Sequence, residues 1–424
     1  MSAKFIQKVI EFSKTLLDPR KGRNKSYSYS EIFMATYSVF HMQSQSFLVH
    51  QQRLKHKFAT HNGKTLFGFD EIPSENQMRN VMDALNPCDL KPLTDSLFSG
   101  IDLNEFKAEG GLVIALDGVQ YFSSAKVSCA CCIKKEHESG TRYYHSMLCP
   151  VLIHPEQKCV LPMAPEFITP QDGEKKQDCE INTAKRWCAE QRSWLQDNHV
   201  TILGDDLFSR APFVKQLLGY FGVRFLLVAK PTSHIYLQSW LSPYAESDYE
   251  TVRTTEKRGK KKRIYTYKIY KDVPLNGDAD APIVNYFEMQ VENENGKISY
   301  KNSWITNHKI DKTNIHRIAR MGRDRWKIEN EAFNILKTKG YNLEHNFGHG
   351  KKNLAKILAC FNLLAFWVHH LMALHDKLYQ TARSHFGARV RFFQTLSVVT
   401  SIQIFESWEH LLAFMSDVFA RDKI

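Results

Sequence analysis

Three short segments, far apart in the sequence, each carry an acidic residue at the end of a regular pattern. Residues 112–117 and 200–205 are apolar runs that finish with an aspartate, a pattern typical of buried strands. Residues 325–331 favour a helix with two glutamates. Carboxylates that folding brings together are ligands for hard divalent cations such as Mg²⁺. We therefore expect a fold in which two strand ends and one helix meet around metal ions.

At the two strand ends, one aspartate each is predicted to face the metal ions. Asp117 follows its strand directly and precedes Gly118, which leaves room for another backbone to approach. Asp205 and Asp206 compete at the second strand. Because side chains alternate along a strand, only one of them should point into the cluster, and we favour Asp205. For Asp117, the alternative is a turn aspartate without a metal role.

The helical segment offers two candidates, Glu329 and Glu331. Two positions on a helix are separated by about 200° around the axis, so only one carboxylate can face the metal ions. Arg325 lies one turn before Glu329 and hence on the same face, where its guanidinium can bind phosphate through two hydrogen bonds. This spacing favours Glu329. The neighbouring Trp326 is expected either to pack in the core or to stack on a base.

The charge balance is basic, because 57 Lys and Arg residues stand against 45 Asp and Glu residues, for a formal net charge of +12. This excess indicates a polyanionic partner without saying which one. Nine cysteines at irregular spacing do not form a disulfide framework, which favours a reducing cytosol. The longest apolar run, residues 357–372, is shorter than a bilayer span, so it predicts a buried core helix and no membrane segment.

Hydrophobic periodicity divides the chain into regions of different character. Residues 29–50 read as one helix, and Ser74 is a plausible N-cap of another. Further along, strands are expected at 112–116, 143–153, 159–164, 199–203 and 223–229, with helices at 178–197 and 212–220. The regions are 1–105, a basic helical module expected to bind DNA or to pack or dimerise; 106–230, the first part of a catalytic α/β domain; 231–304, an antiparallel β insertion; 305–375, the second part of that domain, with the glutamate helix; and 376–424, a C-terminal helical region.

The strand order β-β-β-α-β-α-β, with acids after the first and fourth strands, is that of the ribonuclease-H-like fold. The surrounding motifs resemble the DDE transposases of bacterial insertion sequences, in the group with a β-rich insertion before the glutamate. The resemblance covers roughly residues 110–375. It rests on Ala115-Leu116-Asp117-Gly118, Leu203-Gly204-Asp205-Asp206-Leu207-Phe208, Arg323-Asp324-Arg325-Trp326-Lys327-Ile328-Glu329, Phe333-Asn334-Ile335-Leu336-Lys337 and Leu343-Glu344-His345. The chain departs from the family pattern at Gly322, where a tyrosine is expected, and at Leu336, where a lysine is expected.

The resemblance implies a transposase in which Asp117, Asp205 and Glu329 hold two Mg²⁺ or Mn²⁺ ions. The implied reactions are metal-dependent cleavage at transposon ends and attack of the freed 3′-hydroxyl on target DNA. The implied partners are terminal inverted repeats, target DNA and a second copy of the chain, in the bacterial cytosol. Two alternatives remain: a nuclease of the same fold without strand transfer, and a transposase-derived DNA-binding protein without catalysis.

Several residues are expected to contact DNA. Arg325, Trp326 and Lys337 lie on the predicted glutamate helix. The insertion adds a basic run that reads as a hairpin tip, either solvated or touching phosphate. Its residues are Lys260, Lys261, Lys262 and Arg263.

A second metal site is a weaker expectation. The cysteines and histidines of residues 129–149 lack the paired spacing of a zinc motif, so buried cysteines at the start of a strand are the favoured interpretation. His345 and His349 are four residues apart, but neighbouring glycines break the helix that would pair them as ligands. We expect both histidines in a loop or against phosphate.

Overall fold

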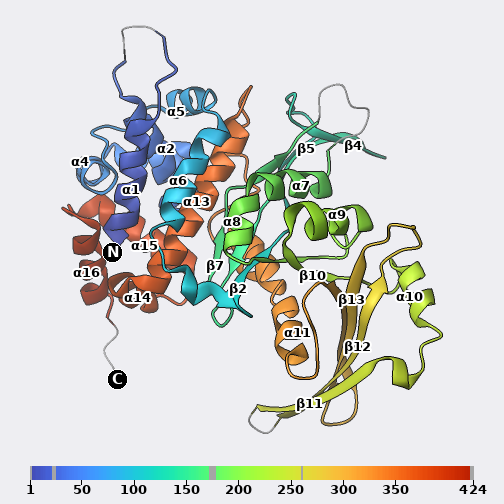
Figure 1. The fold of residues 1–424 in the computed structure, drawn as a ribbon. Coiled ribbons are helices and arrows are strands. Elements are labelled where there is room, and N and C mark those ends of the chain that lie inside the picture. Colours follow the sequence, from blue (N-terminus) through green and yellow to red (C-terminus); the bar gives the residue numbers. More distant parts are fainter. Residues whose placement is uncertain (1, 22–24, 171–177, 259–260, 421–424) are drawn as a thin grey trace.

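The computed structural model describes residues 2–21, 25–170, 178–258 and 261–420. A large mixed sheet lies beside a body of helices that both ends of the chain supply (Figure 1). The expected α/β class with helical terminal regions is confirmed at this level.

The main sheet has ten strands in the described part of the chain. They are β1 (Lys107–Ala108), β2 (Gly111–Ala115), β6 (Val151–Ile153), β7 (Val160–Pro162), β9 (Thr201–Gly204), β10 (Arg224–Val228), β11 (Glu250–Arg258), β12 (Lys261–Pro274), β13 (Ile283–Asn293) and β14 (Ile298–Thr306). The order is β11-β12-β13-β14-β10-β9-β2-β6-β7, with β1 paired to β2. β2, β9 and β10 are mutually parallel, and all other pairs are antiparallel. The parallel strands are continuous apolar runs because both of their faces are covered.

A second sheet branches from the main sheet at Asp117. Its strands are β3 (Gly118–Ser124), β4 (Ile133–His137), β5 (Gly140–Leu148) and β8 (Glu166–Ile168), in the order β3-β5-β4 with β8 beside β5. β3 continues from β2 through Asp117, and β5 continues into β6 through Cys149 and Pro150. The prediction of one strand over 143–153 is therefore wrong. Pro150 has no N–H for the ladder, and the chain changes sheets there.

The insertion is antiparallel, as expected. Its strand β14 pairs with β10, so the four strands of the insertion extend the main sheet. β14 pairs with β10 through Leu226 and Thr306, Leu227 and Ile305, and Val228 and Trp304. Trp304 and Ile305 are fully buried, so the insertion shares the core of the main sheet. The β11–β12 hairpin projects from the far end of this sheet (Figure 1).

The helices from the middle of the chain pack against the sheets and alternate with strands along the sequence. They are α7 (Glu180–Glu190), α8 (Arg192–Asp197), α9 (Ala211–Gln216), α10 (Ile235–Leu241), α11 (Ile315–Arg323) and α12 (Asn334–Thr338), with the short segments η4 (Leu217–Phe221), η5 (Glu246–Asp248) and η6 (Ile328–Phe333). η4 and η6 are π-helical.

The two ends of the chain form one helical body (Figure 1). Asn62 donates to the backbone oxygen of Thr400 at 2.7 Å, and Trp408 Nε1 donates to Leu66 O at 2.9 Å. The members are α1 (Ser2–Thr15), α2 (Tyr29–His41), α3 (Phe47–Leu54), α4 (Lys57–Asn62), η1 (Gly63–Phe67), α5 (Glu75–Met82), η2 (Pro87–Leu90), α6 (Lys91–Phe98), η3 (Leu103–Phe106), α13 (Leu354–His375), α14 (Lys377–Ser384), α15 (Arg389–Ile402) and α16 (Trp408–Val418).

Two expectations for the N-terminal helices have different outcomes. Ser74 does cap α5, because its side chain accepts the N–H of Gln77. The single helix over 29–50 is wrong, since α2 ends at His41 and α3 starts after Ser46. Gln43 has a φ of +48°, which a right-handed helix cannot contain, and Ser46 provides the next N-cap.

α13 is long and apolar enough to cross a membrane by length and composition. However, 78% of its most apolar window is buried inside the protein. Phe361, Phe366 and Trp367 are among the side chains that it buries. The expected core helix is thus observed.

Candidate metal-binding active site

The first two acids lie at adjacent ends of parallel strands. The β2–β9 register places Ala115 opposite Leu203, so Asp117 and Asp205, each two residues further along, emerge at the same edge of the sheet. The pairing continues past the end of β2, because Leu116 N donates to Leu203 O at 2.8 Å. Neighbouring strands are separated by about 4.8 Å, which is a spacing at which two carboxylates can share cations.

Arg325 links the third acid to this edge. Its Nη2 donates to Glu329 Oε1 at 2.5 Å, and its Nη1 lies 3.6 Å from Asp117 Oδ2. The expectation that Arg325 and Glu329 share a face is therefore confirmed. Glu329 belongs to the π-helical segment η6, a conformation that is frequent at functional sites.

A fourth carboxylate, which the sequence interpretation missed, reaches the same place. Glu180 is the first residue of α7, and its Oε1 lies so close to Gly118 that a β-carbon on residue 118 would collide with it. A side chain on residue 118 would therefore force the Glu180 side chain to move. An acid in the first turn of a helix is common, so the sequence carries no signal that separates this one from others.

The electrostatics of the cluster favour bound cations. Burial raises the pKa of Asp117 to about 7, opposed by the Arg325 guanidinium and reinforced by the charges of Asp205 and Glu180. Burial and the charge of Asp205 likewise raise the pKa of Glu180. A place where neighbouring negative charges raise the pKa values of Asp117 and Glu180 is one where positive charge lowers the energy of the ionised state.

Asp206 and Glu331, the two competing acids, contact residues outside the carboxylate cluster. Asp206 Oδ1 accepts hydrogen bonds from Lys230 N at 2.7 Å and from Ser233 Oγ at 2.6 Å, so it holds the loop after β10. Glu331 pairs with Lys158 at 3.5 Å, on another side of the helix. These contacts favour the other acid of each pair as the metal ligand.

A buried lysine fixes the turn that precedes the glutamate. Lys327 is 4% exposed, and its Nζ donates to His154 O at 2.7 Å and to Pro155 O at 3.1 Å. Asp324 compensates the charge at 3.2 Å. The glutamate helix is therefore pinned to the turn between β6 and β7.

The two departures from the transposase pattern have structural reasons. A β-carbon on Gly322 would lie 2.9 Å from both Leu226 and Trp304, so no tyrosine fits between α11 and the sheet. Leu336 is fully buried, a position that excludes a lysine. Lys337, the next residue, is partly exposed and forms an ion pair with Glu344 at 2.7 Å.

Trp326 does not pack in the core. Its side chain is 38% exposed beside Arg325, so the packing interpretation is wrong. Contact with a base remains a prediction.

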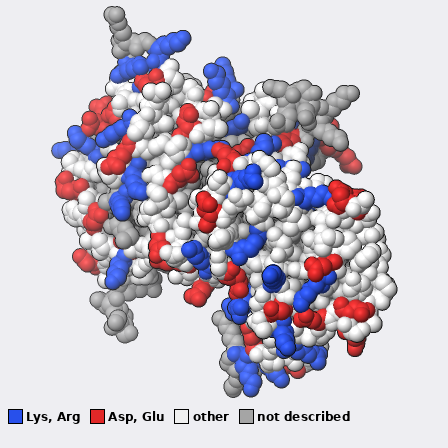
Figure 2. Space-filling view, viewed as in Figure 1, with Lys and Arg blue, Asp and Glu red and all other residues white. Residues whose placement is uncertain are grey.

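The described residues of the basic run lie at the start of β12, which follows the turn of the β11–β12 hairpin. Lys262 and Arg263 are exposed there. Lys260 lies outside the described residues, as does the side chain of Lys261. Figure 2 shows Lys and Arg side chains gathered at this end of the molecule, whereas both charge signs are interspersed over the rest of the visible face. The tip thus belongs to a different part of the surface from the β2–β9 edge.

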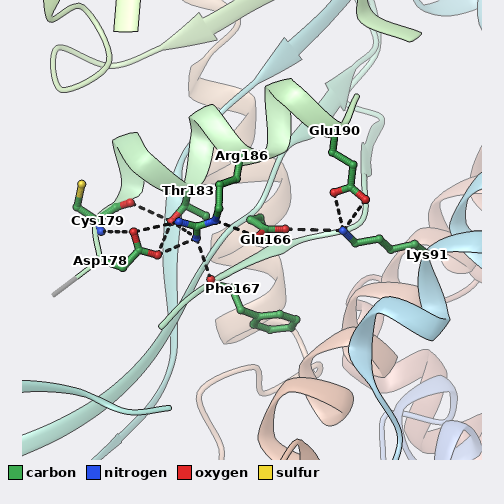
Figure 3. A network of polar contacts seen from close by, with 8 residues as sticks. All are labelled: Lys91, Glu166, Phe167, Asp178, Cys179, Thr183, Arg186 and Glu190. Carbon is green, nitrogen blue, oxygen red and sulfur yellow. Dashed lines mark hydrogen bonds and ion pairs between the residues drawn. The ribbon is translucent and has the colours of Figure 1, made fainter. Parts of the chain in front are cut away.

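A polar network holds α7 and hence Glu180 in place (Figure 3). The Asp178 side chain is fully buried and lies 2.7 Å from Arg186 Nη2. Arg186 also contacts Glu166 of β8 at 3.3 Å. Lys91 of α6 pairs with Glu190 at 2.6 Å, near the other end of α7.

We expect Arg186→Met to lower the free energy of unfolding by about 2 kcal/mol, because it leaves the buried Asp178 carboxylate without its cation. We expect a smaller loss of stability than for a fully buried ion pair, because the Arg186 side chain is 37% exposed and solvent screens its charge. Lys91→Met, the matched control, removes a more exposed pair and should cost at most about 1 kcal/mol. Urea unfolding of both variants measures the difference, and equal losses would contradict the ranking.

The donor set suits Mg²⁺ or Mn²⁺. Asp117, Asp205, Glu180 and Glu329 offer only carboxylate oxygens, the ligands that these hard ions prefer. The structure also brings together a separate group of soft ligands, Cys129, Cys132, His145 and His349. The sequence interpretation considered a zinc site that included Cys129, Cys132 and His145 but favoured buried cysteines, and it did not group His349 with them.

No protein-family profile matches the chain, and no curated protein sequence matches it.

Proposed function

We propose that this protein is a DDE-type DNA transposase, which cleaves DNA at transposon ends and joins the freed 3′-hydroxyl to target DNA. The observation that carries the proposal is that Asp117 and Asp205 lie at one edge of the main sheet, and that Arg325 forms ion pairs with both Asp117 and Glu329. The strand order also supports it. When the second-sheet strands β3, β4, β5 and β8 are left out, the elements β2, β6, β7, α7–α8, β9, α9 and β10 give the order β-β-β-α-β-α-β that we expect for a ribonuclease-H-like fold.

The chain's own residues would perform three tasks. Asp117 and Asp205, on rigid strand ends, would present ligand oxygens at a fixed separation. Two Mg²⁺ or Mn²⁺ ions bound there would activate the attacking oxygen and stabilise the leaving oxygen. Glu329 would complete the ligand set from its helix. Arg325, which pairs with two of these carboxylates, would turn to the phosphate once cations neutralise them.

DNA contacts are proposed along the surface around this edge. Trp326 exposes a flat ring next to Arg325 and can stack on a base near the cut. Lys337 would reach the phosphate backbone by opening its ion pair with Glu344. The exposed Lys262 and Arg263 of the hairpin tip would contact a more distant part of the duplex. The helical body would bind the terminal repeats, in a complex that contains two copies of the chain.

The cytosol of a bacterium is the proposed compartment. The nine cysteines, all within the described residues, are free thiols. Reduced thiols are typical of that environment.

The proposal is tested with linear DNA that contains the reading frame and its genomic flanks, together with a supercoiled target plasmid. In Mg²⁺ or Mn²⁺, we expect cuts at the element ends and joining of those 3′ ends to the plasmid, and in EDTA neither product. Cutting without joining would establish the nuclease alternative. Binding without metal-dependent cutting would establish the DNA-binding alternative, and either result would overturn the proposal.

A further inference from the structure

A compact group of two thiols and two imidazoles lies away from the carboxylates. The Sγ atoms of Cys129 and Cys132 are 3.8 Å apart. His145 Nε2 lies 3.5 Å and 3.4 Å from these two sulfurs. His349 Nε2 lies 3.6 Å from Cys132 Sγ and 3.1 Å from His145 Nε2. All four ligand atoms fall within 4.8 Å of one another.

These separations are the edges of a tetrahedron around one zinc ion. Zn–S bonds of about 2.3 Å and Zn–N bonds of about 2.0–2.1 Å set S···S at about 3.8 Å, S···N at about 3.5 Å and N···N at about 3.3 Å. The five distances given above match these values: the S···S distance is the longest, the three S···N distances are intermediate and the N···N distance is the shortest. Two Cys and two His are also a ligand set of structural zinc sites.

The surroundings prepare the four groups as ligands. His349 Nδ1 donates to Gly350 O at 3.1 Å, which leaves Nε2 with its lone pair free for a metal. The backbone N–H of Cys129 points at Cys132 Sγ at 3.4 Å, a contact that stabilises a thiolate. The rings of Tyr121 and Phe122 lie against the two imidazoles, at centroid distances of 5.7 Å and 4.6 Å. Cys132 and His145 are buried, whereas Cys129 and His349 are partly exposed, so the group is partly shielded from solvent.

We propose that Cys129, Cys132, His145 and His349 bind one structural Zn²⁺ ion. The ion would tie the β3–β5–β4 sheet to the loop that precedes α13. Cys132 and His349 are 217 residues apart in sequence, so the site would close a long loop.

This clamp would act at a junction of three parts of the molecule. Asp117 directly precedes β3, and Cys149 directly follows β5. The backbone N–H of Cys149 donates to Asp117 O at 3.0 Å. Just beyond His349, the Asp83 carboxylate accepts the backbone N–H groups of residues 351–354 at 2.8–3.0 Å. Zinc would therefore hold the sheet next to the active-site strand on the same loop that the helical body grips through Asp83.

The test is the metal content of the full-length protein, measured by inductively coupled plasma mass spectrometry. We expect one equivalent of zinc in the wild type and its loss in Cys132→Ser and His349→Ala. Cys131→Ser is the matched control, because Cys131 lies between the two thiolates but outside the group, and it should keep its zinc. His349→Cys should also keep it, since three Cys and one His form a zinc site as well.

A second measurement does not depend on the folding of any variant. After chelation, the wild-type protein is refilled with Co²⁺, and the intense visible bands of a tetrahedral thiolate-bound cobalt ion are expected. Wild-type protein that contains no zinc and gives no such bands would overturn the proposal, as would iron in place of zinc or a Cys129–Cys132 disulfide found by mass spectrometry. DNA cleavage has no part in these readouts, so they stand whether or not the transposase proposal does.

Discussion

Asp117→Asn and Asp205→Asn are each expected to abolish metal-dependent DNA cleavage and joining. Each change removes one carboxylate charge from the shared strand edge without changing the size of the side chain. Metal ions contribute several kcal/mol to stabilisation of the transition state, and about 4 kcal/mol corresponds to roughly a thousandfold in rate. The loss should therefore reach about three orders of magnitude. Glu329→Gln should cause a loss of the same kind.

The matched controls are the sequence neighbours that face away from the site. Asp206→Asn weakens contacts to Lys230 and Ser233, and Glu331→Gln weakens the pair with Lys158. Both should leave the DNA cleavage rate within about tenfold of wild type, after correction for folded protein by circular dichroism. If Asp206→Asn were inactive and Asp205→Asn active, the second ligand would be Asp206. If all variants retained activity, the carboxylate cluster would not be the active site.

The strand-end aspartates were predictable for a simple reason. A continuous apolar run that stops at an acid reports both burial of the strand and the place where it leaves the sheet. Residues 112–117 and 200–205 have this pattern, and parallel pairing of their strands then puts the two acids side by side. The i, i+4 spacing of Arg325 and Glu329 was readable in the same way.

Other parts of the site depend on packing that no local pattern records. Glu180 reaches Asp117 because α7 docks over Gly118. Trp326 is apolar, but it lies where the helix faces outward. The chain changes sheets at Pro150, so a run that reads as one strand becomes two.

The soft-ligand group shows the limit of spacing arguments most directly. Cys129, Cys132 and His145 lie close in sequence, but their fourth partner is His349, far beyond the β insertion. The glycines around His349 predicted that His345 and His349 would not pair on a helix. This prediction is confirmed, because both histidines lie in the loop before α13 and only His349 belongs to the group. Only the packing of α13 beside the second sheet brings His349 to the cysteines.

Acidification is expected to destabilise the helical body strongly, because it contains four buried histidines. Burial lowers the pKa of His41, His50 and His370 to about 3, and burial with the nearby His41 and Arg389 charges holds the pKa of His369 well below its usual value. The two rings of His41 and His369 lie 4.5 Å apart, so a proton on either would repel a proton on the other.

The direction of this pH effect follows from the protons that the histidines take up when the protein unfolds. In the unfolded chain these histidines bind protons near pH 6.5, whereas in the folded protein they stay neutral down to about pH 3. Unfolding therefore takes up protons between these values, and stability falls as the pH drops below about 6.5. From pH 6.5 to pH 5.5 the loss is about 1 kcal/mol for each histidine, or roughly 4 kcal/mol in total.

The Asp117 carboxyl works in the opposite direction but is outweighed. With its pKa raised to about 7, Asp117 is mostly protonated in the folded state over this interval but ionised in the unfolded chain, so it offsets about 1 kcal/mol. For Asp117 and the four histidines together, a net loss of roughly 3 kcal/mol remains, and the buried His145 and His308, whose pKa values burial lowers to about 4, add to it. Urea unfolding at pH 6.5 and at pH 5.5, in magnesium-free buffer, measures it. A stability that stays constant over this interval would contradict the prediction.

A histidine variant separates this effect from loss of zinc in acid. His369→Phe keeps an aromatic ring in contact with Phe393 and leaves the Cys129, Cys132, His145 and His349 group unchanged. It removes one proton acceptor whose Nε2 has no hydrogen-bond partner among the described residues. The pH dependence of the free energy of unfolding should therefore become shallower by about 1 kcal/mol per pH unit, even if the variant is less stable at pH 7.5. An unchanged slope would show that His369 does not take up a proton on unfolding in this interval, and it would contradict the prediction.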